Sequence, residues 1–80
     1  MDKIELLSKN HFLAYNQVVE DYKSLLVYEQ ELALYNQEKR KFSHIRIKNE
    51  IVILLKRIIE NKNFLCISTK ADEEYLTFFI

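Results

Sequence analysis

The 80-residue chain contains no glycine, no proline and no tryptophan, although a domain of this length usually has about five or six glycines and about four prolines. Phosphate-binding loops of the P-loop and dinucleotide-binding types need glycine, because backbone amides must approach the phosphates closely. The strained serine turn of α/β-hydrolases needs glycine for the same steric reason. The composition therefore excludes these nucleotide-binding and hydrolase motifs.

Cysteine is nearly absent as well. Cys66 is the single thiol, so an intramolecular disulfide and the paired CxxC knuckles of a structural zinc site are both impossible. His11 and His44 have no metal-ligand spacing relative to each other or to this thiol. We expect no metal, no cofactor and no enzymatic activity, and we expect Cys66 to be a small apolar side chain packed in a strand.

Long hydrophobic runs are also missing, since the longest uninterrupted run of strongly apolar residues is 51–55. The first residues lack the basic and apolar regions of a secretory signal. We expect a cytoplasmic protein that does not enter a membrane. Lysine, isoleucine and asparagine, which have A/T-rich codons, are abundant, and this bias indicates a low-GC bacterium, its phage or an archaeal virus.

The charge is balanced overall, with 12 basic and 12 acidic side chains, but it is unevenly distributed. Residues 1–38 carry a net charge of −4, residues 39–62 carry +6 and residues 63–80 carry −2. Blocks of this kind steer partners or pair with each other across a dimer. We expect the contiguous acids at 20–21 and 72–74 to be solvated on a surface and in a turn.

No linker or internal repeat divides the chain, so we take residues 1–80 as one domain. Nothing breaks a helix from about residue 9 to residue 37, although the polar stretch 8–11 could interrupt or restart it. The expected core face of this long helix consists of Ile4, Leu7, Phe12, Tyr15, Val18, Val19, Tyr22, Leu25 and Leu26.

A second helix is expected from Ser43 or His44 to Asn61, because apolar and polar side chains divide cleanly between its two halves. A strand over residues 45–48 competes with it, since apolar and polar residues alternate there. Asn61 or Asn63 is expected to supply the left-handed residue that ends this helix.

Residues 64–68 and 75–80 are rich in aromatic and β-branched side chains, and this pattern predicts an antiparallel β-hairpin. The alternative is a third helix with Thr69 as its N-cap and acidic residues in its first turn. The expected fold class is therefore mostly α with a small C-terminal β-hairpin, a long helix packed on a second helix, and the alternative is an all-α three-helix domain.

Apolar residues at the distal end of the long helix occupy a different sector from the expected core face, and they indicate a protein-docking face. Tyrosine suits such surfaces because it combines a large contact area with a polar end. The candidate protein-interface residues are Tyr28, Leu32, Leu34 and Tyr35.

The basic segment 39–48 is the second candidate site, because clustered cations can bind phosphates. Together with a following helix and hairpin it would resemble a winged helix-turn-helix. The acidic residues of the expected wing and the apolar second helix oppose this interpretation. The candidate nucleic-acid-binding residues are Lys39, Arg40, Lys41, Arg46 and Lys48.

A chain this short buries only about 60–65% of its unfolded surface, so association with another chain is expected. The sequence favours a small, non-enzymatic regulatory or inhibitory protein that binds a larger protein and forms a homodimer. A phage- or mobile-element-encoded inhibitor of a host enzyme or defence nuclease is one concrete form. The alternative is a dimeric, nucleic-acid-binding transcriptional regulator.

Overall fold

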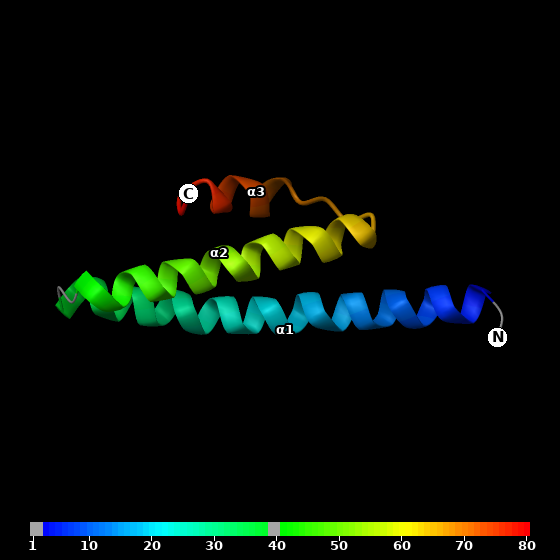
Figure 1. The fold of residues 1–80 in the computed structure, drawn as a ribbon, viewed down its shortest axis with the longest axis horizontal. Helices are drawn as coiled ribbons and strands as arrows, with labels where there is room; N and C mark the ends of the chain where they lie inside the picture. Colours follow the sequence, from blue (N-terminus) through cyan, green and yellow to red (C-terminus); the bar gives the residue numbers. More distant parts are fainter. Residues whose placement is uncertain (1–2, 39–40) are drawn as a thin grey trace.

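The computed structural model contains three helices, and it describes the backbone of residues 3–38 and 41–80 and the side chains of residues 10–34 and 45–80. Helix α1 spans Lys3–Glu38, α2 spans Lys41–Phe64 and α3 spans Lys70–Leu76. α1 and α2 form an antiparallel hairpin, and α3 turns back along α2 (Figure 1). The N-terminal end of α1 extends beyond the end of α2 (Figure 1).

The two long helices form as expected because no glycine or proline interrupts them. α1 passes through the polar stretch 8–11 without a break, and residues 45–48 are helical rather than a strand. The side chains on α1 that face α2 recur three or four residues apart, which keeps them on one side of the helix. We call this set the inner stripe: Ala14, Val18, Asp21, Leu25, Tyr28 and Leu32.

The core lies between all three helices. Its fully enclosed members come from α1 and α2: Leu25, Ile47, Ile51, Leu54, Leu55 and Ile58. Tyr28 and Leu32 of α1 pack against this cluster, and so do Tyr75, Leu76 and Phe79 from α3 and the turn that follows it. The broad apolar side of α2 is therefore shared between α1 and α3.

The predicted C-terminal β-hairpin is wrong, because no strand occurs in residues 3–38 or 41–80. The alternative all-α three-helix domain fits. Phe64 is the last residue of α2, and α3 places Tyr75, Leu76 and Phe79 at helical spacing against the core. An isolated two-stranded hairpin is only marginally stable, whereas this arrangement covers apolar side chains of α2.

The turn after α2 is closed by Cys66, not by Asn61 or Asn63. Cys66 has a φ of 59°, in the left-handed region that favours glycine. Its amide donates to the carbonyl of Asn63 and the Ile67 amide donates to the carbonyl of Lys62, at 3.1 and 2.8 Å. This bonding pattern is a Schellman motif, which satisfies carbonyls at the helix end. The Cys66 side chain is exposed and not packed in a strand.

Candidate interaction surface

A second set of apolar side chains on α1 lies beside the inner stripe, and one of its members, Tyr22, reaches Lys62 of α2 and Asp72 of α3. This set also recurs at three- and four-residue intervals, so it forms a second continuous stripe along the helix. We call it the outer stripe: Phe12, Tyr15, Val19, Tyr22 and Leu26. Phe12, Tyr15 and Leu26 are 64%, 58% and 56% exposed, while Val19 is half-buried.

The sequence could not separate the two stripes, and the expected core face merged them. Val18 and Leu25 are buried as expected, whereas Phe12, Tyr15 and Leu26 are exposed. Both stripes have the period of an amphipathic helix, and they lie side by side on the circumference of α1. Only the position of α2 determines which of them is covered.

α3 contacts the outer side of α1 through two polar connections. The Tyr22 hydroxyl donates to Oδ1 of Asp72 at 2.5 Å, and Lys62 Nζ donates to Oδ2 of Asp72 at 2.6 Å and to the Tyr22 hydroxyl at 2.8 Å. One helical turn further along α3, the Tyr75 hydroxyl donates to Oε1 of Glu29 at 2.8 Å. These bonds fix the orientation of Tyr22 and Glu29 beside the exposed part of the outer stripe.

The same contacts shift three ionisation equilibria in one direction. Burial and the hydrogen bond to Asp72 raise the pKa of Tyr22, although Lys62 opposes this. Burial and the bond to Glu29 raise the pKa of Tyr75 to about 12. Burial lowers the pKa of Lys62, but its bonds to Asp72 and Tyr22 outweigh this and raise it. Because all three pKa values are raised, the folded protein favours the protonated forms of these groups. Their contribution to the docking of α3 is therefore present below about pH 10 and is lost as the pH rises further.

The expectation that the acidic clusters are solvated holds for Glu20, Glu73 and Glu74, which are exposed. It is wrong for Asp21 and Asp72, which are only 1% and 7% exposed. Arg57 donates from Nε and Nη2 to the two carboxylate oxygens of Asp21, at 2.8 and 2.6 Å. Gln17 Nε2 adds a third bond to Oδ1 at 2.8 Å. The hydrogen bonds that Arg57 donates to Asp21 raise the pKa of Arg57, although its partial burial opposes this. The sequence signal for the burial of Asp21 was its spacing, three residues after Val18 and four before Leu25, which both belong to the expected core face.

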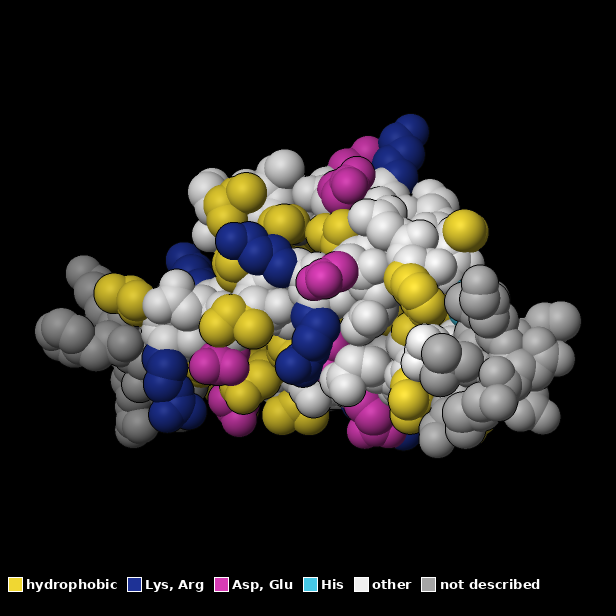
Figure 2. Space-filling view, turned by 45° about the vertical axis from the view of Figure 1, so that its right-hand side comes forward, with side chains coloured by type: hydrophobic (Ala, Val, Ile, Leu, Met, Phe, Trp, Pro, Cys, Tyr) yellow, Lys and Arg dark blue, Asp and Glu magenta, His cyan; other side chains and the backbone are white. Residues whose placement is uncertain are grey.

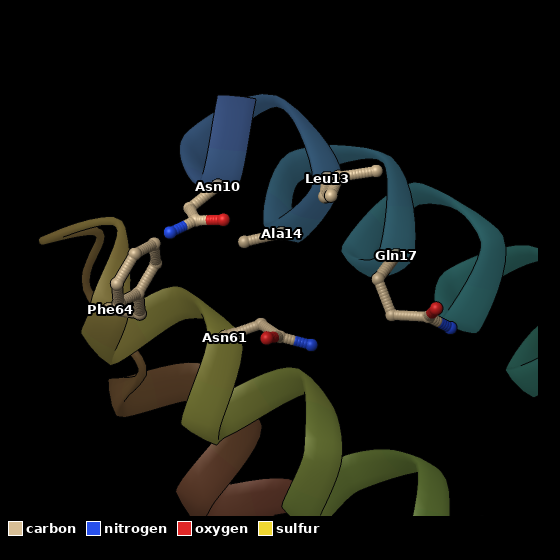
Figure 3. Close-up of a pocket in the computed structure, with 6 residues that line it drawn as sticks. All are labelled: Asn10, Leu13, Ala14, Gln17, Asn61 and Phe64. Atoms are coloured by element: carbon tan, nitrogen blue, oxygen red, sulfur yellow. The ribbon is translucent and has the colours of Figure 1, made fainter. Parts of the chain in front are cut away.

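An open groove of about 360 Å³ lies where α1 crosses the end of α2 (Figure 3). Its lining combines carboxamides with apolar groups and consists of Asn10, Leu13, Ala14, Gln17, Asn61 and Phe64. Beside it the His11 ring packs at a tilt against Phe64, with ring centroids 5.2 Å apart and an angle of 52° between the ring planes. Amides and apolar groups suit hydrogen bonding to a polypeptide rather than acid–base or nucleophilic chemistry.

The predicted protein-interface residues lie on more than one side of α1. Tyr28 and Leu32 are half-buried and pack against the core. Leu34 is 58% exposed, and Val27 and Leu13, which lie seven and 21 residues before it, are 53% and 56% exposed. Glu20 occupies the position between Leu13 and Val27 in this series. The side chain of Tyr35 lies outside the described part of the structure.

Of the predicted nucleic-acid-binding residues, Arg46 and Lys48 are exposed on α2. They are two positions apart, which directs them to different sides of a helix. Lys39 and Arg40 lie outside the described residues, and so does the side chain of Lys41. The side chains that the structure describes do not gather this basic segment on one surface.

Among the described residues there is no group of three or more histidine, cysteine or acidic side chains arranged to hold a metal ion. None of the helical segments searched there is both long enough and apolar enough to cross a membrane. On the face that Figure 2 shows, hydrophobic side chains lie in small groups between charged ones rather than in one large patch.

Comparisons of the chain with protein-family models, with curated proteins and with solved structures give no match.

Proposed function

We propose that this protein is a small non-enzymatic regulatory or inhibitory protein that acts by binding another protein through α1. The observation that carries the proposal is the exposed apolar surface of α1 outside the inner stripe. It includes the outer stripe. It also includes the line of Leu13, Val27 and Leu34, and each of these three side chains is more than half exposed. Exposed apolar side chains that follow one another at three- and four-residue spacing, as in the outer stripe, are typical of sites that bind another chain, whereas isolated ones are common on any surface.

The chemistry of the other surfaces supports the same conclusion. The buried polar side chains Asp21 and Asp72 are satisfied by partners within the chain, so they support the fold. The groove offers carboxamides and apolar groups, which suit contacts with a polypeptide. α1 also remains ordered as one helix of 36 residues, so it presents these side chains on a rigid element, which lowers the entropic cost of binding.

Site-specific photo-cross-linking in cells that produce the protein tests this proposal. A benzophenone amino acid is placed at Val27 on α1, and a control is placed at Glu73, which is exposed on α3. The expected result is one defined product from Val27 that contains a second, different protein and is absent from the control. Products that contain only a second copy of this chain, or equal products from both positions, would refute the proposal.

A further inference from the structure

α3 is a short helix whose structure depends on the surface beneath it. It has seven residues, of which only Asp72 is buried, and the side chain of its N-cap residue Thr69 makes no capping bond. Isolated helices shorter than about 12–15 residues are only marginally stable in water. α3 is therefore helical because it is docked on α1 and α2, and not because of contacts within its own seven residues.

The surface beneath α3 is apolar and is formed by the two long helices. α3 lies along α2 (Figure 1), and its side chains supply its hydrogen bonds to α1. The side chains that pack against the buried cluster of α1 and α2 come from α3 and the turn after it, and each is only partly buried: Tyr75, Leu76 and Phe79. α3 thus covers this part of the core from outside, whereas α1 and α2 enclose the buried cluster between them.

Polar groups at the edge of this surface match particular side chains of α3. Lys62 Nζ and the Tyr22 hydroxyl both donate to the carboxylate of Asp72, at 2.6 and 2.5 Å. Three residues further along α3, Glu29 accepts a hydrogen bond from the Tyr75 hydroxyl at 2.8 Å. The Lys62 side chain is only 14% exposed under α3, so a docked helix without a carboxylate here would leave a covered, unpaired cation.

We infer that this surface, with Tyr22, Glu29 and Lys62 at its edge, is a binding site for an amphipathic helix of another protein, and that α3 is its detachable cover. We call the surface the α3 site. The partner helix has the pattern of α3, namely an acidic residue followed by tyrosine at the third position, leucine at the fourth and an aromatic residue at the seventh. Docking of such a helix on an apolar groove is a common mode of protein recognition. The inference goes beyond the proposed function, which concerns the exposed side of α1.

The short connection to α2 makes α3 a competitor of any external helix. Because residues 65–69 tether α3 to α2, it competes at an effective concentration in the mM range, on the order of that for other short linkers. The apparent dissociation constant of an external helix is its intrinsic value divided by the fraction of molecules in which α3 is released. α3 therefore excludes helices that fit poorly, and a helix that fits better replaces it.

Native-state hydrogen exchange of the full wild-type chain measures the release of α3. The amides of Glu73 and Thr77 are hydrogen-bonded to the carbonyls of Thr69 and Glu73, at 2.9 and 3.3 Å. We expect them to exchange at least about 10-fold faster than the amides of Leu55 and Ile58 in α2, and with a smaller dependence on denaturant, because release of α3 exposes less surface than global unfolding. Equal rates with equal denaturant dependence would overturn the inference, because α3 would then open only when the whole protein unfolds.

Fluorescence anisotropy with a labelled peptide of residues 65–80 tests whether the uncovered site binds an external helix. In the full chain, Asp72→Lys places a second cation beside Lys62 and releases α3, whereas Glu73→Lys makes the same charge change at an exposed position. The peptide is expected to bind the Asp72→Lys chain at least about 10-fold more tightly than the wild-type or Glu73→Lys chain, because a larger fraction is open. Binding to none of the three chains, or equal binding to all of them, would overturn the inference. Far-UV circular dichroism verifies that α1 and α2 remain helical.

A charge reversal tests the recognition of the acidic side chain. A peptide with the Asp72→Lys substitution is expected to bind the Asp72→Lys chain at least about 10-fold more weakly than the unmodified peptide does, and a Lys62→Glu chain should restore its binding. Equal binding of both peptides to the Asp72→Lys chain, or no restoration by Lys62→Glu, would refute the assigned pattern. Val27 lies outside the α3 site, so the cross-link from Val27 to a different protein is independent of these results and the two proposals fail separately.

Discussion

In the ion pair between Asp21 and Arg57 one partner is buried and the other is exposed, so the loss of either partner should have a different effect on stability. The carboxylate is almost completely buried, whereas the guanidinium side chain is 49% exposed. Replacing Arg57 leaves a buried charge with Gln17 as its remaining donor. Replacing Asp21 leaves the Arg57 guanidinium without its partner, but water can reach this group. The two substitutions remove the same ion pair, yet they should differ in their effect on the free energy of unfolding.

The magnitudes follow from the burial of each partner. Breaking a fully buried pair costs about 3–5 kcal/mol, and because water can reach this site from the arginine side we expect about 2–3 kcal/mol for Arg57→Ala. For a chain of this size this loss corresponds to a fall in Tm of about 10–20 °C. Asp21→Leu should cost no more than about 1 kcal/mol, because leucine fits between Val18 and Leu25 and Arg57 becomes hydrated. The double variant Asp21→Leu with Arg57→Met should be as stable as wild type or more stable.

Urea unfolding followed by far-UV circular dichroism measures all three variants. Arg46→Ala, an exposed change on the same helix, is the control and should stay within about 0.5 kcal/mol of wild type. Equal losses for Arg57→Ala and Asp21→Leu would refute the argument, because they would mean that burial of the carboxylate does not control the energy of the pair.

Three further predictions concern the turn, the α3 contacts and the core. Cys66→Gly should stabilise the protein by about 0.5–1 kcal/mol in urea unfolding, because it removes a β-carbon at a φ of 59°. Stability should fall as pH rises from 10 to 12, by up to about 1.4 kcal/mol per pH unit for one group, because the pKa of Tyr75 is raised from 10 to about 12. Tyr75→Phe should reduce this slope. Leu55→Ala should cost about 2–5 kcal/mol, since Leu55 is fully buried.

Each of these predictions has a matched control. Cys66→Ala keeps the β-carbon and should give no gain, so equal gains for alanine and glycine would contradict the strain argument. Tyr28→Phe changes a tyrosine for which no side-chain hydrogen bond to α3 is observed, so equal effects of Tyr28→Phe and Tyr75→Phe on the slope would contradict the role of the Tyr75 hydroxyl. Ile53→Ala removes an aliphatic side chain that is 54% exposed, and a cost equal to that of Leu55→Ala would contradict the placement of the core.

The sequence by itself determined the two long helices. Their existence depends on local properties, namely the absence of helix breakers and a hydrophobic period of 3.6 residues. The observed α1 and α2 extend the predicted segments by a few residues at their ends, where local propensity is weakest. The helical alternative for the C-terminal segment was also present in the sequence, in Thr69 and the acids that follow it, although the Thr69 side chain makes no capping bond.

Only the tertiary structure decided what each face of α1 contacts. Periodicity gives a residue its direction around a helix but does not identify the neighbour in that direction, so the inner and outer stripes of α1 look equivalent in the sequence. The burial of Asp21 also depends on Arg57, which lies 36 positions away. Likewise, the choice of α3 over a hairpin depends on the apolar face that α2 leaves open. These features arise from contacts between distant segments, which local sequence patterns do not encode.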